Sequence, residues 1–168
     1  MAVSPLNILF FFTVSTPFIG WIASKLHVRS LCGIYATVGI AISGYTLYKL
    51  SQQVMSKPMS IPINAGIFEA CLRIDVLSVF IASVFIALGF IATLYSIKYM
   101  EDEGGLPLYY TLVLTMISGM IGVAFSGDFF TLFVFWELMC IPSYMLVSFR
   151  KDRWEPIEAG LKYLVMSS

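Results

Sequence analysis

The feature that most restricts the fold of this chain is a series of apolar runs, most of them near 20 residues long, separated by short polar segments. An α-helix rises about 1.5 Å per residue, so about 20 apolar residues cross the roughly 30 Å hydrocarbon core of a bilayer. Apolar residues make up 59% of the chain and charged residues only 12%, which is outside the balance of a soluble domain. We therefore expect an all-α membrane protein.

Five of the runs are long enough for complete transmembrane helices, and a sixth run is shorter. We expect helices at about residues 6–24, 30–50, 76–96, 108–126, 129–149 and 156–168. The sixth run is too short to cross a bilayer. We interpret residues 1–168 as a single transmembrane domain, the N-terminal part of a longer subunit. A short re-entrant sixth helix is the alternative.

Residues 51–75 are polar and contain Pro58 and Pro62, which argue against a helix through this segment. We expect an outer loop there, with room for a short hairpin. Lys and Arg concentrate in cytoplasmic loops. Six of them alternate to one side (Lys25, Arg29, Lys98, Arg150, Lys151, Arg153) and three to the other (Lys49, Lys57, Arg73). This asymmetry favours an N-terminus outside.

Composition also bears on ligands. The formal net charge is zero and the basic residues form no patch, so nothing suggests nucleic-acid binding. Cys32, Cys71 and Cys140 stand far apart, without the spacing of a zinc site or an iron–sulfur cluster. We expect no metal site and no cofactor in this chain.

Two ionisable residues lie inside apolar runs, where such side chains are costly and commonly mark a path for ions or protons. Glu137 and Lys162 each lie about eight residues, or about 12 Å, from the nearer end of their helices, but from opposite sides. Consecutive antiparallel helices pack about 8–10 Å apart. We therefore expect the two side chains to reach the same depth and to meet directly or through one water.

Such a pair can control protonation. Burial raises the pKa of a lone carboxylate and lowers that of a lone ammonium, and a nearby opposite charge reverses both shifts. At an effective dielectric constant near 20, unit charges about 4 Å apart interact by about 4 kcal/mol, or about three pKa units. In the alternative reading, Glu137 only ties helices together by hydrogen bonding, and Lys162 snorkels or neutralises Glu158.

Neighbouring residues support a wet site at Glu137. Pro142 has no N–H, so the carbonyl of Leu138 loses its helical partner and can hold water; a simple packing kink is the alternative. Tyr144 lies seven positions after Glu137 and shares its face, with Ser143 beside it. Both hydroxyls can extend a hydrogen-bonded chain.

Three further features flank the pair. Glu158 precedes Lys162 by four residues, the favourable order for an ion pair within a helix. Asp128 is expected to cap the helix at 129–149, with a role at a channel mouth as the alternative. Gly119 and Gly122 are expected to allow close packing of helices.

Several stretches closely resemble the antiporter-like membrane subunits of complex I, F(420)H(2) dehydrogenase, membrane-bound hydrogenases and Mrp-type cation/proton antiporters. SGDFFTLFVFWELM at 126–139, followed by Pro142, Ser143 and Tyr144, resembles the fifth-helix signature of that family. RIDVLS at 73–78 is similar to the lead into its third helix, and EAGLKY at 158–163 is similar to its sixth-helix motif. The resemblance covers essentially the whole chain.

The resemblance implies that Glu137 is the channel glutamate and Lys162 a lysine of the central hydrophilic axis. It implies proton translocation within a respiratory complex or a Mrp-type antiporter, with sodium–proton exchange and a non-conducting structural role as alternatives. Family members have many more helices, built as two inverted repeats, so this chain is expected to be a fragment or one part of a split subunit.

It also implies where the chain works and what it meets. Redox chemistry belongs to other subunits of an oxidoreductase of the NADH:quinone, F(420)H(2) dehydrogenase or hydrogenase type. The expected partners are other membrane subunits, lipid, H+ and possibly Na+. The expected location is the plasma membrane of a prokaryote, with an inner organelle membrane as the alternative.

Overall fold

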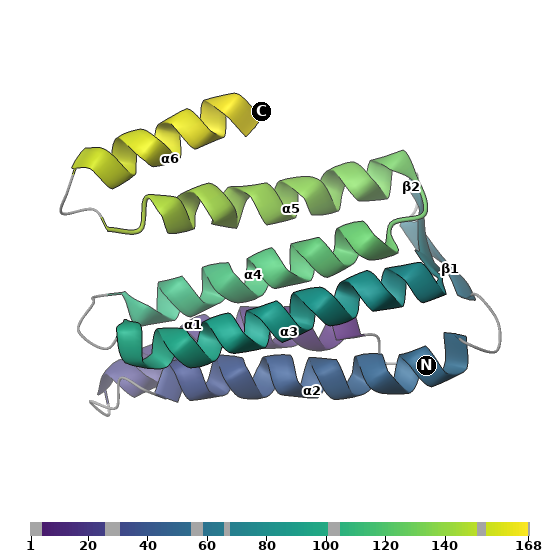
Figure 1. Cartoon of the computed structure of the whole chain (residues 1–168), viewed down its shortest axis with the longest axis horizontal. Helices are drawn as coiled ribbons and strands as arrows, with labels where there is room; N and C mark the ends of the chain where they lie inside the picture. The colour runs from purple at the N-terminus through teal and green to yellow at the C-terminus, as the bar shows by residue number, and fades with distance from the viewer. Residues whose placement is uncertain are drawn as a thin grey trace.

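The computed structural model describes residues 5–25, 31–54, 59–65, 68–100, 105–150 and 154–167. These residues form six α-helices and one two-stranded hairpin (Figure 1). The elements are α1 (Pro5–Lys25), α2 (Leu31–Val54), β1 (Met59–Ala65), β2 (Phe68–Ile74), α3 (Val76–Tyr99), α4 (Leu106–Phe125), α5 (Phe129–Val147) and α6 (Trp154–Ser167). Successive helices run in alternating directions, so the hairpin and the α4–α5 turn lie at the same end of the molecule (Figure 1).

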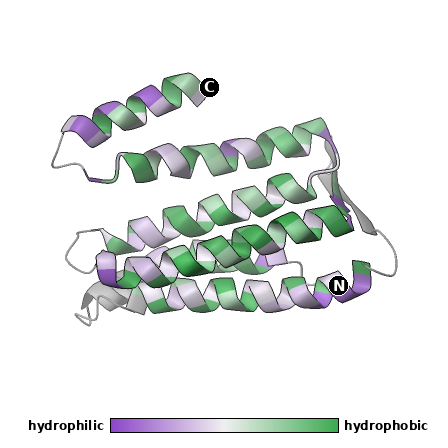
Figure 2. Ribbon diagram, in the orientation of Figure 1, coloured by the Kyte–Doolittle hydropathy of each residue, from purple (hydrophilic) through white to green (hydrophobic). Residues whose placement is uncertain are grey.

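Three helices are long and apolar enough to cross a membrane: α3, α4 and α5, with 24, 20 and 19 residues. Figure 2 shows apolar residues over most of their length. In α1 the side chains are described for Pro5–Phe18 only, and this stretch is apolar. The 24 residues of α2 are less apolar because they include several Ser, Thr and Gln side chains. A helical membrane protein therefore fits the structure, whereas five complete spans and an outer N-terminus stay predictions.

The polar segment after α2 contains an antiparallel hairpin, with its register running from Met59 opposite Ile74 to Ala65 opposite Phe68. Pro62 lies opposite Cys71. A two-stranded hairpin consists of edge strands, where a residue without an N–H is tolerated. The expected loop at 51–75 is shorter than predicted, because α2 continues to Val54.

The core lies among α1, α2, α3 and α4. In this four-helix bundle α1 packs against α2 and α4, α2 against α3, and α3 against α4. The fully buried side chains include Leu9, Ile40, Leu114 and Ile121. Buried hydroxyls bond to carbonyls one turn earlier, as Thr37 does to Gly33 at 2.7 Å, and this satisfies donors that lipid cannot.

Two glycines bring α5 close to α4. A Cβ on Gly119 would lie 2.7 Å from the backbone nitrogen of Met139, and a Cβ on Gly122 would overlap the ring of Phe135. The expected role of these glycines in close packing is confirmed. The sixth helix lies on the other side of α5, away from the bundle (Figure 1). The chain thus consists of the four-helix bundle and an outer pair, α5 and α6.

Candidate functional site

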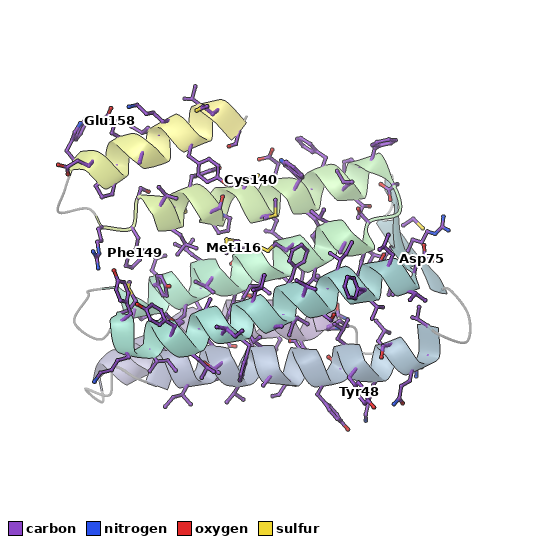
Figure 3. All side chains as sticks on the ribbon, viewed as in Figure 1. Tyr48, Asp75, Met116, Cys140, Phe149 and Glu158 are labelled. Atoms are coloured by element: carbon purple, nitrogen blue, oxygen red, sulfur yellow. The ribbon has the colours of Figure 1, made fainter. Side chains whose placement is uncertain are left out.

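Glu137 lies on the side of α5 that faces away from the bundle. The face toward α4 is marked by Phe135, by Met139 and by the buried Cys140, which points to α4 (Figure 3). Glu137 is two residues after Phe135, about 200° around the helix. Its side chain is half-buried, and none of the described residues forms an ion pair with it. Its role in proton transfer stays a prediction.

Lys162 forms an ion pair with Glu158, with 2.7 Å between Nζ and Oε1. This is the pair that the four-residue spacing predicts. Both side chains are exposed in this structure, 70% for Lys162 and 47% for Glu158. An exposed pair of this kind adds at most about 1 kcal/mol to stability. Glu158 and Lys162 lie on the face of α6 opposite Gly160, which contacts α5. Figure 3 shows Glu158 on the outer side of α6.

The contact between α5 and α6 is formed by small and hydroxyl-bearing residues. Gly160 lies against Ser148, where an added Cβ would come within 2.8 Å of the serine Cβ. The hydroxyls of Ser143 and Tyr163 are hydrogen bonded at 3.3 Å. The ring of Tyr163 meets that of Tyr144 edge to face, with centroids 6.4 Å apart. We call Ser143, Tyr144 and Tyr163 the hydroxyl cluster.

Tyr163 is the member of this cluster that sequence reasoning missed. The sequence places Tyr144 and Ser143 near Glu137, whereas it does not single out Tyr163. Its spacing carried the signal. Tyr163 lies three residues after Gly160, so the two share one face of α6, and glycine is typical of the face where two membrane helices touch.

The register of α5 and α6 sets the depths of Glu137 and Lys162. Ser148 lies opposite Gly160, and Ser143 lies opposite Tyr163. Continued along both helices, this register places Lys162 level with Met145, eight residues or about 12 Å from Glu137 along the α5 axis. The structure differs here from the expectation of equal depth, because the close contact at Gly160 fixes how far the two helices overlap.

Pro142 is buried within α5, and the helix continues past it to Val147. The neighbouring Ser143 hydroxyl donates to the carbonyl of Cys140 at 2.7 Å. A hydrated carbonyl at Leu138 stays a prediction. Among the described residues, no group of three His, Cys, Asp or Glu side chains could hold a metal ion.

Asp128 caps α5 as expected. Its Oδ1 accepts the backbone N–H of Thr131 at 2.7 Å, and its Oδ2 accepts the Thr131 hydroxyl at 2.7 Å. The Oδ2 atom also accepts the N–H of Cys71 in β2 at 2.7 Å. These donors, with the Thr131 N–H first and the Cys71 N–H second, hold the pKa of Asp128 below its ordinary value of 3.8. A role at a channel mouth stays a prediction.

The chain is similar to two described family segments. Residues 61–110 match "NADH-Ubiquinone oxidoreductase (complex I), chain 5 N-terminus", and residues 126–168 match "NADH:quinone oxidoreductase/Mrp antiporter, TM". Together the two matched stretches cover more than half of the chain. They include most of the hairpin, all of α3, Asp128, Glu137 and the motif that carries Lys162.

Individual relatives agree. The chain is 32% identical over 140 residues to F(420)H(2) dehydrogenase subunit N of Methanosarcina mazei, which covers 83% of the chain and 28% of that relative. It is 25% identical over 149 residues to Na(+)/H(+) antiporter subunit A1 of Staphylococcus haemolyticus, covering 89% of the chain and 17% of that relative. The chain therefore spans less than a third of the length of these relatives.

A solved structure has the same fold. A chain of the membrane-bound sulfane sulfur reductase, an archaeal respiratory membrane complex, superposes with a TM-score of 0.85 at 25% identity. The match covers 98% of this chain and 33% of the other. The arrangement of the six helices and the hairpin is thus found in a respiratory membrane assembly.

Proposed function

Because this chain belongs to the family of antiporter-like membrane subunits of complex I and Mrp-type antiporters, we propose that it works in proton translocation within such a complex. The observation that carries the proposal is Glu137, a carboxylate in an apolar spanning helix, on the face that the four-helix bundle leaves uncovered. A carboxylate facing lipid alone would be costly. We infer that this face of α5 meets protein or water in the assembled complex.

The hydroxyl cluster lies between the levels of the two charged positions, and in this proposal it forms part of a route that water completes at both ends. Tyr144 shares the helical face of Glu137, Tyr163 neighbours Lys162 in α6, and Ser143 is bonded to Tyr163 across the helix contact. A proton released by the Glu137 carboxylic acid can pass to water and along these hydroxyls, each accepting one proton and giving up another. Glu158, paired with Lys162, stabilises the ammonium at the far end of the route.

The distance favours a relay over direct pairing. If the axial offset of about 12 Å were the whole separation of the two charges, they would interact by about 1.4 kcal/mol at an effective dielectric constant of 20, or about one pKa unit. Direct contact at about 4 Å would give about three times that energy. Lys162 therefore biases the protonation of Glu137 modestly in this arrangement, and strong coupling requires bridging hydroxyls or water.

Membership of this family also suggests where the chain is located and which partners it has. We propose that the chain is an N-terminal part of a subunit that lies in the plasma membrane of a prokaryote and crosses it several times. Its partners are other membrane subunits, and the lipid contacts lie on the apolar outer faces of α1, α2 and α3. Redox chemistry, in this proposal, belongs to other subunits.

The test is Glu137→Gln in the complete membrane complex that contains this chain. Gln keeps the size and hydrogen-bonding capacity of Glu but binds no proton, so proton translocation into membrane vesicles should fall to background, while the complex still assembles. The matched control is Glu155→Gln, the same substitution in the exposed first turn of α6. Unchanged translocation in Glu137→Gln would instead support a non-conducting structural role.

Sodium–proton exchange is the second candidate, because the chain is also similar to a Na(+)/H(+) antiporter subunit. Replacing Na+ with K+ on both sides of the membrane distinguishes the two. Proton movement that persists at the same rate supports translocation of protons alone, whereas movement that requires Na+ supports exchange.

A further inference from the structure

Three elements meet at Asp128. The residue is the N-cap of α5, it lies three residues after the end of α4 at Phe125, and its Oδ2 atom accepts a hydrogen bond from the backbone of β2. The N–H of Gly127 also donates to the Cys71 carbonyl at 2.8 Å, and Leu72 pairs with Ser126 as an isolated antiparallel bridge. The short α4–α5 turn therefore lies along β2 as a third strand would.

The register of the hairpin explains why the N–H and the carbonyl of Cys71 are available to the α4–α5 turn. Cys71 lies opposite Pro62, and both its N–H and its carbonyl point to the α4–α5 turn. Gly127 allows the approach, because a Cβ there would lie 2.9 Å from the Cys71 carbonyl oxygen. Backbone groups of β2 and of the turn thus form most of this contact, and the Asp128 carboxylate adds a hydrogen bond from its side chain.

The carboxylate serves two sides at once. One oxygen caps the first turn of α5 through the Thr131 N–H, and the other accepts the Cys71 N–H of β2. A helix cap alone would require only one acceptor atom. The second bond makes the hairpin and the start of α5 a single unit.

We propose that Asp128 is a positioning residue, which fastens the β-hairpin to the start of α5 and thereby sets the axial position of the helix that carries Glu137. Glu137 lies nine residues, or about 13.5 Å, further along α5. The close contact with α4 holds the middle of α5 at Gly119 and Gly122, and the bonds of Asp128 hold its first turn. The inference rests on the proposed function only for its consequence in translocation; the fastening can be measured separately.

The test separates the cap from the fastening. In Asp128→Ser the single, shorter hydroxyl still caps α5, since Ser and Asp are equally good caps, but it cannot also reach Cys71. In Asp128→Ala both bonds are lost. Hydrogen–deuterium exchange of the amides of Cys71 and Thr131 is followed in the intact membrane complex. Asp75→Ser is the matched control, because Asp75 caps α3 without any side-chain bond to its first turn.

We expect Asp128→Ser to speed exchange at Cys71 by about tenfold, the change that follows loss of a hydrogen bond to a charged acceptor, and to leave Thr131 protected. Asp128→Ala should speed exchange at both amides, and Asp75→Ser at neither. Wild-type protection of Cys71 in Asp128→Ser would overturn the proposal.

The rate of proton translocation by the assembled complex tests the effect of Asp128 on function. If Asp128 were only a cap, Asp128→Ser would pump as the wild type does; as a positioning residue, its loss should reduce the rate several-fold at equal amounts of assembled complex. An unchanged rate with fast exchange at Cys71 would overturn the link to Glu137. If the wild-type complex pumps no protons, the proposed function fails, and the exchange experiment still decides the fastening.

Discussion

The helices α4 and α5 are almost equally apolar, with mean hydropathies of 1.8 and 1.7 over their most apolar windows, yet 56% of the α4 window is buried and only 17% of that of α5. Hydropathy alone does not distinguish them; their neighbours do. The fourth helix packs against α1, α2, α3 and α5, whereas α5 has α4 on one face and α6 on another.

This difference in burial distinguishes the four-helix bundle, which stabilises the fold, from the α5–α6 pair, which carries the candidate site. The four-helix bundle holds its side chains in a dense core. Its buried Ser and Thr hydroxyls bond to carbonyls of their own helices, and the Tyr110 hydroxyl of α4 accepts from Ser96 of α3. The α5–α6 pair carries Glu137, Lys162 and the hydroxyl cluster, and most of its side chains outside the contact with α4 are exposed. A site that must change protonation requires neighbours that can rearrange, and the outer pair provides that freedom.

The largest expected effect tests the contact that joins the two regions. Gly119→Ala would place a Cβ 2.7 Å from the backbone of Met139, which cannot move aside as a side chain can. We expect the complex to lose about 3 kcal/mol of stability, measured as a lower thermal midpoint in detergent. Gly44→Ala is the control, since its Cβ would meet only a methyl group of Ile86 at 3.3 Å. Equal midpoints for the two variants would show that α4 and α5 are not closely packed.

The next effect compares equal truncations in the two regions. Leu114→Ala empties a fully buried position of α4, and we expect a loss of about 2 kcal/mol. Leu132→Ala removes the same atoms from α5, where the side chain is 38% exposed, and should cost less than half as much. Thermal midpoints of the two variants in the assembled complex provide the measurement. Equal costs would mean that another protein surface covers α5 at Leu132.

A smaller effect concerns the hydroxyl cluster. Tyr163→Phe removes the hydrogen bond to Ser143 but keeps the ring against Tyr144. We expect proton translocation to slow about fivefold, equivalent to about 1 kcal/mol, with little change in stability. Tyr48→Phe, on the outer side of α2 (Figure 3), is the control and should change neither property. A wild-type rate in Tyr163→Phe would remove this hydroxyl from the proposed route.

The smallest effect is a pH dependence at the α5 cap. Because the pKa of Asp128 in the folded chain is lower than its ordinary value, the carboxylate contributes stability above pH 3.8, and this contribution is lost as the pH falls through the folded pKa. The isosteric Asp128→Asn variant should therefore have a slightly lower thermal midpoint than the wild type at pH 7. The two midpoints should converge in strong acid. A difference that persists at pH 2 would assign the effect to the shape of the side chain.

Sequence reasoning succeeded where an interaction lies within a few residues. The cap at Asp128, the pair of Glu158 with Lys162 and the approximate helix positions follow from helical periodicity and from end signals that single segments carry. The family resemblance, drawn from the motifs around Glu137 and Lys162, is confirmed by the matched family segments and relatives. The roles of Glu137 and Lys162 in translocation stay predictions.

By itself, the sequence determined that this chain requires a membrane, which family it belongs to, and where its unusual charges lie along the helices. Only the tertiary structure decided that Glu137 and Lys162 differ in level, that Tyr163 faces Ser143, and that Asp128 holds the hairpin. Local periodicity fixes the direction of a side chain around its own helix. The position of one helix along the axis of its neighbour depends on contacts between the two helices, such as Gly160 against Ser148. The sequence of a single helix does not contain these contacts.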